Sequence, residues 1–248
     1  MSERPGPHAV DLTISRITEA DARVAATAAA LSDEQMREPS LLPGWTRGHV
    51  LTHIARNADG LGNLLTWART GTETPQYASR EARDEEIEAG AGRPAAELVE
   101  DVVSSSAAFV ALARELPAQA WTAEVRGMRG PAHPAWFTLQ RRLTEVEIHH
   151  VDIAGAYTAA DWPDWFLATM TYEVIGQMSA KPEAPSAVLT DTTSGRQYLL
   201  PPSGPPENAG ELAISGPGHE LLAWLLGRGD GAALTADPDG PLPSLPPY

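Results

Sequence analysis

Residues 134–157, PAWFTLQRRLTEVEIHHVDIAGAY, contain the clearest helical pattern in the chain. Apolar side chains recur there every three or four residues, which is the period of a helix with one buried face. Pro134 suits the first turn of such a helix, where a backbone N–H is not needed. The pattern predicts a long amphipathic helix that begins at Pro134 and reaches about Tyr157.

Three further long helices are expected before this one, over residues 8–31, 46–69 and 94–116. The second of them has a suitable N-cap in Thr46 and a suitable C-cap in Gly71. Four long helices joined by loops are typical of a helical bundle.

The pattern changes after Ala160. Short β-type stretches replace long helical ones, and proline and glycine become frequent between them. The expected elements are helices over 163–179 and 217–227 and strands over 187–190, 196–200 and 211–214, followed by an extended tail. We therefore predict an α+β protein with a helical bundle over residues 1–160 and a small mixed α/β domain over residues 161–248.

The composition excludes several classes of function. The chain has 248 residues, a formal net charge of −15 and no cysteine. So acidic a surface repels phosphate backbones and anionic lipids, which makes nucleic acids and membranes poor partners. Without cysteine the chain has no disulfide, no thiolate metal site and no cysteine nucleophile. Any thiol chemistry must use a sulfur from another molecule.

The start of the chain and its hydropathy suggest where the protein works. The first residues, MSERPGPHAVDL, lack the apolar stretch of a secretory signal. No window approaches the roughly 18 apolar residues of a membrane span. These features predict a cytoplasmic protein. We expect a monomer, because no long exposed heptad pattern is present.

The segment TEVEIHHVD, residues 144–152, carries the best candidates for chemistry. Glu145 and His149 are four residues apart and therefore share one helix face. Asp152 follows three residues later and could accept the second imidazole N–H. His53 lies in the apolar stripe of the second long helix. Two histidines and a carboxylate are the ligand set of catalytic zinc sites, with bonds of about 2.0–2.2 Å.

A second interpretation of these residues stays open. A helical Glu-x-x-x-His pair is more often a surface pair, or a core histidine with a satisfied hydrogen bond, than a metal site. His150 points about 100° away from His149 and is expected to be a supporting or surface residue. The remaining candidates, His8, His133 and His219, are expected in termini or loops and have no assigned role.

Arginines are the second group of candidates. An acidic protein that binds an anionic small molecule needs local positive charge, and a guanidinium grips a carboxylate with two hydrogen bonds. The candidates are Arg83, Arg228 and the pair Arg141–Arg142. For each one alone, an ordinary solvated ion pair is the alternative. The tryptophans, Trp45 among them, are expected to be structural.

Four segments together resemble the mycothiol-dependent maleylpyruvate isomerase family. They are SLLPGWTRGHVLTHIARNADGLGNLLTWARTGTETPQY (40–77), EARDEEI (81–87), TEVEIHHVDIAGAY (144–157) and GRGDG (227–231). The resemblance implies a DinB-like metal-binding four-helix bundle joined to a small α/β domain. It also implies a Zn²⁺ site on His53, Glu145 and His149, with functional roles for Asp152 and Arg228.

The resemblance further implies mycothiol as a thiol cosubstrate and the conversion of maleylpyruvate to fumarylpyruvate. In that reaction a metal-activated thiolate adds to the double bond, the single bond rotates, and elimination returns the thiol. Arg228 and Arg83 would bind the carboxylates of this anionic substrate, and Asp152 would orient His149 or serve proton transfer.

Related thiol-dependent S-transferases, which join mycothiol to another electrophile, would use the same residues. A metal-binding module without catalysis is the third possibility. The loop 117–133 and the proline-rich stretch 201–206 are further places that could shape the pocket.

Overall fold

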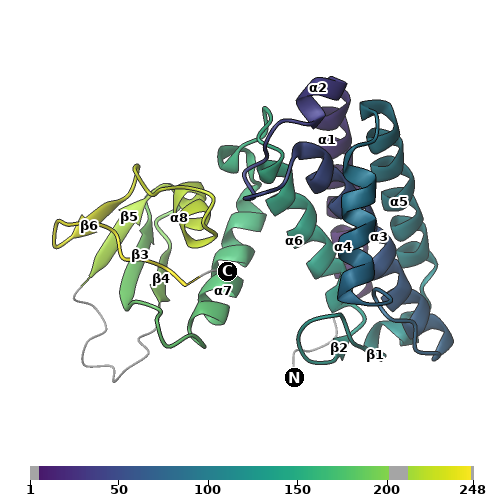
Figure 1. Ribbon diagram of the computed structural model, residues 1–248. Coiled ribbons are helices and arrows are strands. Elements are labelled where there is room, and N and C mark those ends of the chain that lie inside the picture. The colour runs from purple at the N-terminus through teal and green to yellow at the C-terminus, as the bar shows by residue number, and fades with distance from the viewer. Residues whose placement is uncertain (1–5, 201–211, 247–248) are drawn as a thin grey trace. The chain divides into compact units, whose positions relative to one another are not determined.

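The computed structural model describes residues 6–200 and 212–246 (Figure 1). The chain divides into two compact units, Met1–Ala156 and Tyr157–Tyr248, so the boundary lies four residues before the predicted one. Tyr157 and Thr158 group with the second unit because both bond to Asp161 in the 3-10 helix η2 (Ala159–Asp161). That helix packs against α8 (Gly218–Leu225).

The first unit is a bundle of four long helices, as predicted. They are α1 (Pro7–Ala29), α3 (Arg47–Thr70), α5 (Ala95–Glu115) and α6 (Phe137–Asp152). Both α1 and α3 pack against α5 and α6, which closes the bundle (Figure 1). Because α3 and α6 are neighbours, side chains more than 80 residues apart in sequence can meet between them.

Short elements connect and flank these helices. They are α2 (Asp33–Met36), α4 (Arg80–Ala91), the 3-10 helix η1 (Ala118–Thr122), and the antiparallel strands β1 (Glu124–Val125) and β2 (His133–Pro134). The helix α4 packs on α3. Two glycines allow this close approach: a Cβ at Gly48 would clash with the Ala91 carbonyl oxygen, and one at Gly90 would lie 2.5 Å from the Thr52 methyl group.

The predicted caps of α3 are confirmed. The Thr46 hydroxyl accepts a hydrogen bond from the His49 N–H, and the His49 side chain accepts one from the Thr46 N–H. Gly71 ends the helix with a φ of +72°, a left-handed conformation that glycine adopts without a Cβ penalty. The caps therefore set where α3 begins and ends.

The predicted limits of α6 are wrong at both ends. Pro134 lies in β2, paired with Glu124, and the helix begins only at Phe137. The helix ends at Asp152 instead of continuing to Tyr157, because Ala154 takes a left-handed φ of +54°. Arg47 stabilises this end by donating hydrogen bonds to the carbonyl oxygens of residues 153 and 154.

The second unit is a small mixed sheet with helices packed on it. Its strand order is β4 (Gln197–Leu200), β3 (Ala187–Asp191), β5 (Ala213–Gly216) and β6 (Thr235–Asp237). Only the central pair, β3 and β5, is parallel. The helices α7 (Asp164–Met178) and α8 contact each other and the sheet.

This second unit confirms the predicted α+β class and adds one strand. The added edge strand β6 lies mostly before the tail 237–248 that we expected to be extended and shares only Asp237 with it. The stretch 201–206 lies outside the described residues. Among the residues that are described, no helix is both long and apolar enough to cross a membrane.

Candidate metal centre

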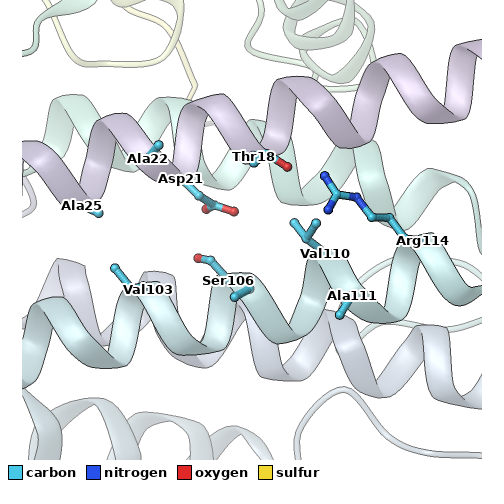
Figure 2. Close-up of a pocket in the computed structure, with 10 residues that line it drawn as sticks. Thr18, Asp21, Ala22, Ala25, Val103, Ser106, Val110, Ala111 and Arg114 are labelled. Carbon is cyan, nitrogen blue, oxygen red and sulfur yellow. The ribbon is translucent and has the colours of Figure 1, made fainter.

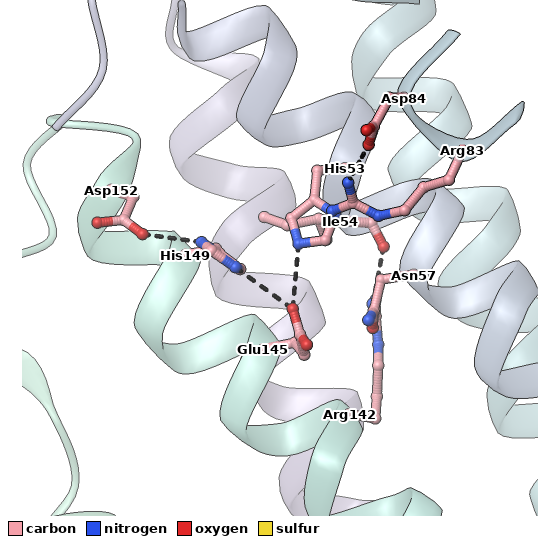
Figure 3. A network of polar contacts seen from close by, with 9 residues as sticks. All are labelled: His53, Ile54, Asn57, Arg83, Asp84, Arg142, Glu145, His149 and Asp152. Atoms are coloured by element: carbon pink, nitrogen blue, oxygen red, sulfur yellow. Dashed lines mark hydrogen bonds and ion pairs between the residues drawn. The ribbon is translucent and has the colours of Figure 1, made fainter. Parts of the chain in front are cut away.

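Three side chains from α3 and α6 converge inside the bundle (Figure 3). The Glu145 Oε2 atom lies 3.1 Å from Nε2 of His53 and 3.3 Å from Nε2 of His149. All three donor atoms lie within 4.8 Å of one another. In the described ranges 6–200 and 212–246, no other three histidine, aspartate or glutamate side chains are grouped closely enough to share an ion.

The local sequence explains this convergence. His53 is only 4% exposed because it belongs to the buried stripe of α3, next to Leu51 and Ile54. Glu145 and His149 lie one helical turn apart on α6 and present their side chains on the same face. The packing of α3 against α6 then brings that face to His53.

Asp152 contacts the other nitrogen of His149. Its Oδ2 atom lies 2.8 Å from His149 Nδ1, and the Asp152 side chain is fully buried. A carboxylate at Nδ1 holds a proton there, which orients the imidazole and leaves Nε2 facing Glu145. Asp152 is therefore placed to orient His149 as a ligand.

Arg83 reaches the site from α4. Its NH2 group donates to Nδ1 of His53 at 3.1 Å, and its NH1 group donates to Asp84 at 2.6 Å (Figure 3). The guanidinium carbon also lies 5.9 Å from the centre of the Tyr77 ring. The site thus combines three possible metal ligands with one adjacent cation.

The electrostatic environment gives the two histidines very different pKa values. Burial lowers the pKa of His53 to about 4, so its imidazole is neutral at neutral pH. Burial also acts to lower the pKa of His149, but hydrogen bonds to Asp152 and Glu145 outweigh it and raise the pKa to about 9. Burial acts to raise the pKa of Glu145, yet hydrogen bonds to His149 and His53 hold it well below its usual range.

The donor geometry fits a divalent ion. In tetrahedral coordination with bonds of about 2.0–2.2 Å, the distance between two ligand atoms is about 3.4 Å. The two contacts of Glu145, at 3.1 and 3.3 Å, are close to that separation. Two imidazoles and one carboxylate also leave a fourth position for an exogenous ligand.

One contact must change when His53 binds an ion through Nε2. Its Nδ1 atom then carries the proton and can no longer accept a hydrogen bond. The Arg83 guanidinium has donors only, so it must leave Nδ1. Metal binding is therefore coupled to release of the Arg83 NH2 group beside the site.

The other candidates belong to several different elements of the chain. Arg228 belongs to the second unit, where it follows α8 and donates to the Leu226 carbonyl oxygen at 2.8 Å. His150 is buried and contacts Thr27. His8 lies in α1, His133 in β2 and His219 in α8, and none of them joins the centre.

Arg142 has a structural role inside the bundle. Its side chain is completely buried, and its NH2 group donates to Asp21 at 2.7 Å and to Ser106 at 2.9 Å. Its NH1 group donates to the Ile54 carbonyl oxygen and to Asn57. These bonds tie α6 to the other three long helices. One turn of α6 separates Arg142 from Glu145, so the same bonds fix the helix that carries two of the ligands.

A separate concavity of about 310 Å³ lies between α1 and α5 (Figure 2). Asp21 and Ser106 face each other across it, and the remaining lining is mainly small and apolar. The lining residues are Thr18, Asp21, Ala22, Ala25, Val103, Ser106, Ala107, Val110, Ala111 and Arg114. None of the three converging ligands belongs to it.

Two aromatic residues near the centre were missed as functional candidates. The Trp45 ring lies 5.6 Å from the His53 ring in an edge-on arrangement, although we expected it only to pack at the start of α3. Tyr77 lies under Arg83. Trp45 precedes His53 by eight residues and Tyr77 follows it by 24, and the only signal for them was their place in the 40–77 segment.

Comparisons with known proteins agree with this two-unit organisation. The family model described as the mycothiol maleylpyruvate isomerase N-terminal domain matches residues 17–154, and the MDMPI C-terminal domain model matches residues 150–247. A comparison with curated proteins finds no match.

Two solved structures are similar over nearly the whole chain. One is the crystal structure of the mycothiol-dependent maleylpyruvate isomerase, with 31% identity and a TM-score of 0.88. The other is a histidine-to-alanine mutant of that enzyme, with 30% identity and a TM-score of 0.87. Each match covers 96% of this chain and 97% of the other. Since both domain models match in order and the likeness extends through both units, the chain belongs to the mycothiol-dependent maleylpyruvate isomerase family.

Proposed function

We propose that this chain catalyses the mycothiol-dependent cis–trans isomerisation of maleylpyruvate to fumarylpyruvate. The observation that carries the proposal is the convergence of His53 Nε2, Glu145 Oε2 and His149 Nε2. The solved relative that is named for this activity supports the choice of substrate and thiol. The absence of cysteine agrees with it, because the sulfur must then come from a cosubstrate.

His53, Glu145 and His149 would hold a Zn²⁺ ion, which this donor set suits. When bound, the ion would supply a Lewis acid that favours the thiolate form of the cosubstrate. Asp152 would keep His149 oriented. His149 itself must give up the proton that it carries in the metal-free protein, because its Nε2 lone pair is needed for the ligand bond.

In the proposed reaction the thiolate sulfur forms a C–S bond with one alkene carbon. The π electrons move onto the conjugated carbonyl oxygen, and the former double bond can rotate. Their return breaks the C–S bond and releases the thiolate with the trans product. No oxidant is needed. The two steps of addition and elimination each have a lower energy barrier than direct rotation about the double bond.

The substrate has two carboxylates, and the chain must bind them despite its net charge of −15. Arg83, once released from His53, would bind one of them next to the centre. Arg228 of the second unit is proposed for the other. A guanidinium would also stabilise the enolate charge that develops during the reaction.

The test is to assay the purified zinc form with mycothiol and maleylpyruvate. We expect loss of the cis isomer and formation of fumarylpyruvate only when the thiol is present, and loss of this activity in His53→Ala. The matched control is His219→Ala, which removes a histidine far from the ligands in sequence. A stable thiol adduct without isomerisation would replace this proposal with an S-transferase. Bound zinc without any thiol-dependent reaction would favour a binding module.

A further inference from the structure

Tyr77 is fixed against the helix that carries His53. A Cβ at Gly60 would lie 2.9 Å from Cε1 and 3.0 Å from Cζ of the Tyr77 ring, so the hydroxyl end of the ring packs on the backbone of α3. Gly60 lies seven residues after His53 and hence on the same side of the helix. Tyr77 therefore lies on the helix face that leads to the metal centre.

The neighbouring residue anchors this segment. The Gln76 side chain is buried and accepts a hydrogen bond from the Met128 N–H at 2.9 Å. The backbone carbonyl oxygen of Gln76 accepts one from the Asn63 side chain at 3.4 Å. The backbone before Tyr77 is thus held from both sides, which limits the positions open to the phenol.

Arg83 connects Tyr77 to the ligands. Its guanidinium carbon lies 5.9 Å from the ring centre of Tyr77, while its NH2 group reaches His53 at 3.1 Å. Burial raises the pKa of Tyr77, and the Glu145 carboxylate raises it further, although Arg83 opposes both effects. The phenol is therefore a hydrogen-bond donor at neutral pH and lies within the electrostatic reach of the centre.

The donors at this site favour the binding of an anion. When His53 binds the ion through Nε2, Arg83 loses His53 Nδ1 as an acceptor. The guanidinium, which lies over the Tyr77 ring, and the Tyr77 hydroxyl are then both available as donors near the position of a divalent cation. A carboxylate offers acceptor oxygens to both, and a charge-assisted hydrogen bond is stronger than a neutral one.

We propose that Tyr77 and Arg83 together bind one carboxylate of the substrate beside the metal centre, with the Tyr77 hydroxyl as the second donor. This inference rests on the proposed function, which makes a dicarboxylate the substrate. Tyr77 is then a substrate-binding residue that positions the double bond for thiolate attack. Its loss weakens substrate binding and leaves the metal in place.

The test uses Tyr77→Phe, which keeps the ring and its packing on Gly60 and removes only the hydroxyl. The probe is heptanedioate, the saturated seven-carbon dicarboxylate, which has no double bond for a thiol to attack. Calorimetric titration of the zinc-loaded protein is expected to show binding about tenfold weaker or more in Tyr77→Phe. In the isomerase assay the KM for maleylpyruvate rises by a similar factor, while the KM for mycothiol and the zinc content are unchanged.

Tyr172→Phe is the matched control, because it removes the same hydroxyl from a tyrosine that is 63% exposed on α7. It is expected to bind heptanedioate as the unchanged protein does. The double variant Tyr77→Phe with Arg83→Gln is expected to lose less than the product of the two single effects, because both side chains bind the same carboxylate.

The outcomes separate this inference from the proposed function. If Tyr77→Phe binds heptanedioate and maleylpyruvate as the unchanged protein does, the carboxylate site is overturned while the isomerase activity stands. A loss of zinc in Tyr77→Phe also overturns it, because the residue then acts on the metal site. If the unchanged protein binds heptanedioate but does not isomerise maleylpyruvate, the proposed function fails, and weaker binding in Tyr77→Phe still supports the carboxylate site.

Discussion

The Asp152 carboxylate lies 2.8 Å from Nδ1 of His149, within a single turn of α6 and fully buried. This contact fixes both the orientation of the ring and the nitrogen that carries the proton. It also raises the proton affinity of His149 in the metal-free protein. If His149 binds a metal ion as proposed, this one residue would both orient the imidazole and make metal binding sensitive to pH.

Replacing Asp152 tests its two effects on His149, the orientation of the imidazole and the raised pKa. We expect Asp152→Asn to keep the side-chain shape but to lower zinc affinity by about 10- to 100-fold. The pKa of His149 in the metal-free protein is expected to fall from about 9, because the buried carboxylate charge is gone. Competition with a chromophoric chelator measures the first change, and an NMR titration of the imidazole protons measures the second. Unchanged zinc affinity would show that Asp152 does not orient the ligand.

Zinc binding is expected to become stronger with increasing pH. Below its pKa of about 9, His149 is protonated in the metal-free protein, and the ion must displace that proton. His53 is already neutral there, since its pKa is about 4. The apparent zinc affinity should therefore rise about tenfold per pH unit between about pH 6 and pH 8, with about one proton released per ion. Titrations in buffers of different ionisation enthalpy count that proton, and an affinity independent of pH would contradict the assignment of His149.

The buried pair of Arg142 and Asp21 is expected to be important for stability. Asp21→Ala would leave a completely buried guanidinium without a counter-charge, which costs about 3–5 kcal/mol. Urea unfolding of the metal-free protein measures this change in the free energy of unfolding. The control is Asp59→Ala, which breaks a pair between the exposed Asp59 and the half-buried Arg56 and is expected to cost about 1 kcal/mol or less. Equal costs for the two variants would show that the buried pair has no special role.

The contact between α3 and α4 supplies a further test. Gly48→Ala would place a methyl group against the Ala91 carbonyl oxygen and push α4, with Arg83, away from α3. We expect a destabilisation of about 1–3 kcal/mol and weaker binding of dicarboxylates. Gly62→Ala is the control on the same helix, because its new methyl group meets only the end of the Leu112 side chain, at 3.3 Å. That variant is expected to be neutral or slightly stabilising, since alanine favours helix over glycine.

Much of the bundle could be predicted from local signals. The caps at Thr46 and Gly71 lie where the residue types indicated, because capping depends on a few neighbouring backbone groups. The start of α6 was mispredicted for a related reason. Pro134 suits a first helical turn, but here it pairs with Glu124 in a two-stranded sheet, a contact between segments ten residues apart that no helical pattern contains.

The sequence alone also did not reveal what most arginines do. Arg142 and Arg83 are the same residue type with the same charge, yet one is buried in an ion pair with Asp21 and the other donates a hydrogen bond to His53. The difference depends on which helix each residue faces across the bundle. Tyr77 was missed for the same reason, since its ring meets α3 only through the fold.

The sequence by itself determined that the first unit has four long helices, that Glu145 and His149 lie four residues apart, and that any thiol chemistry must use an external sulfur. These properties depend on residue types and on neighbours within one turn of a helix. The tertiary structure alone decided that His53 meets Glu145, a residue 92 positions later, and that Arg83 and Tyr77 lie beside them. Such contacts depend on how α3 packs against α4 and α6, because side chains on separate helices become neighbours only when whole apolar faces are buried together.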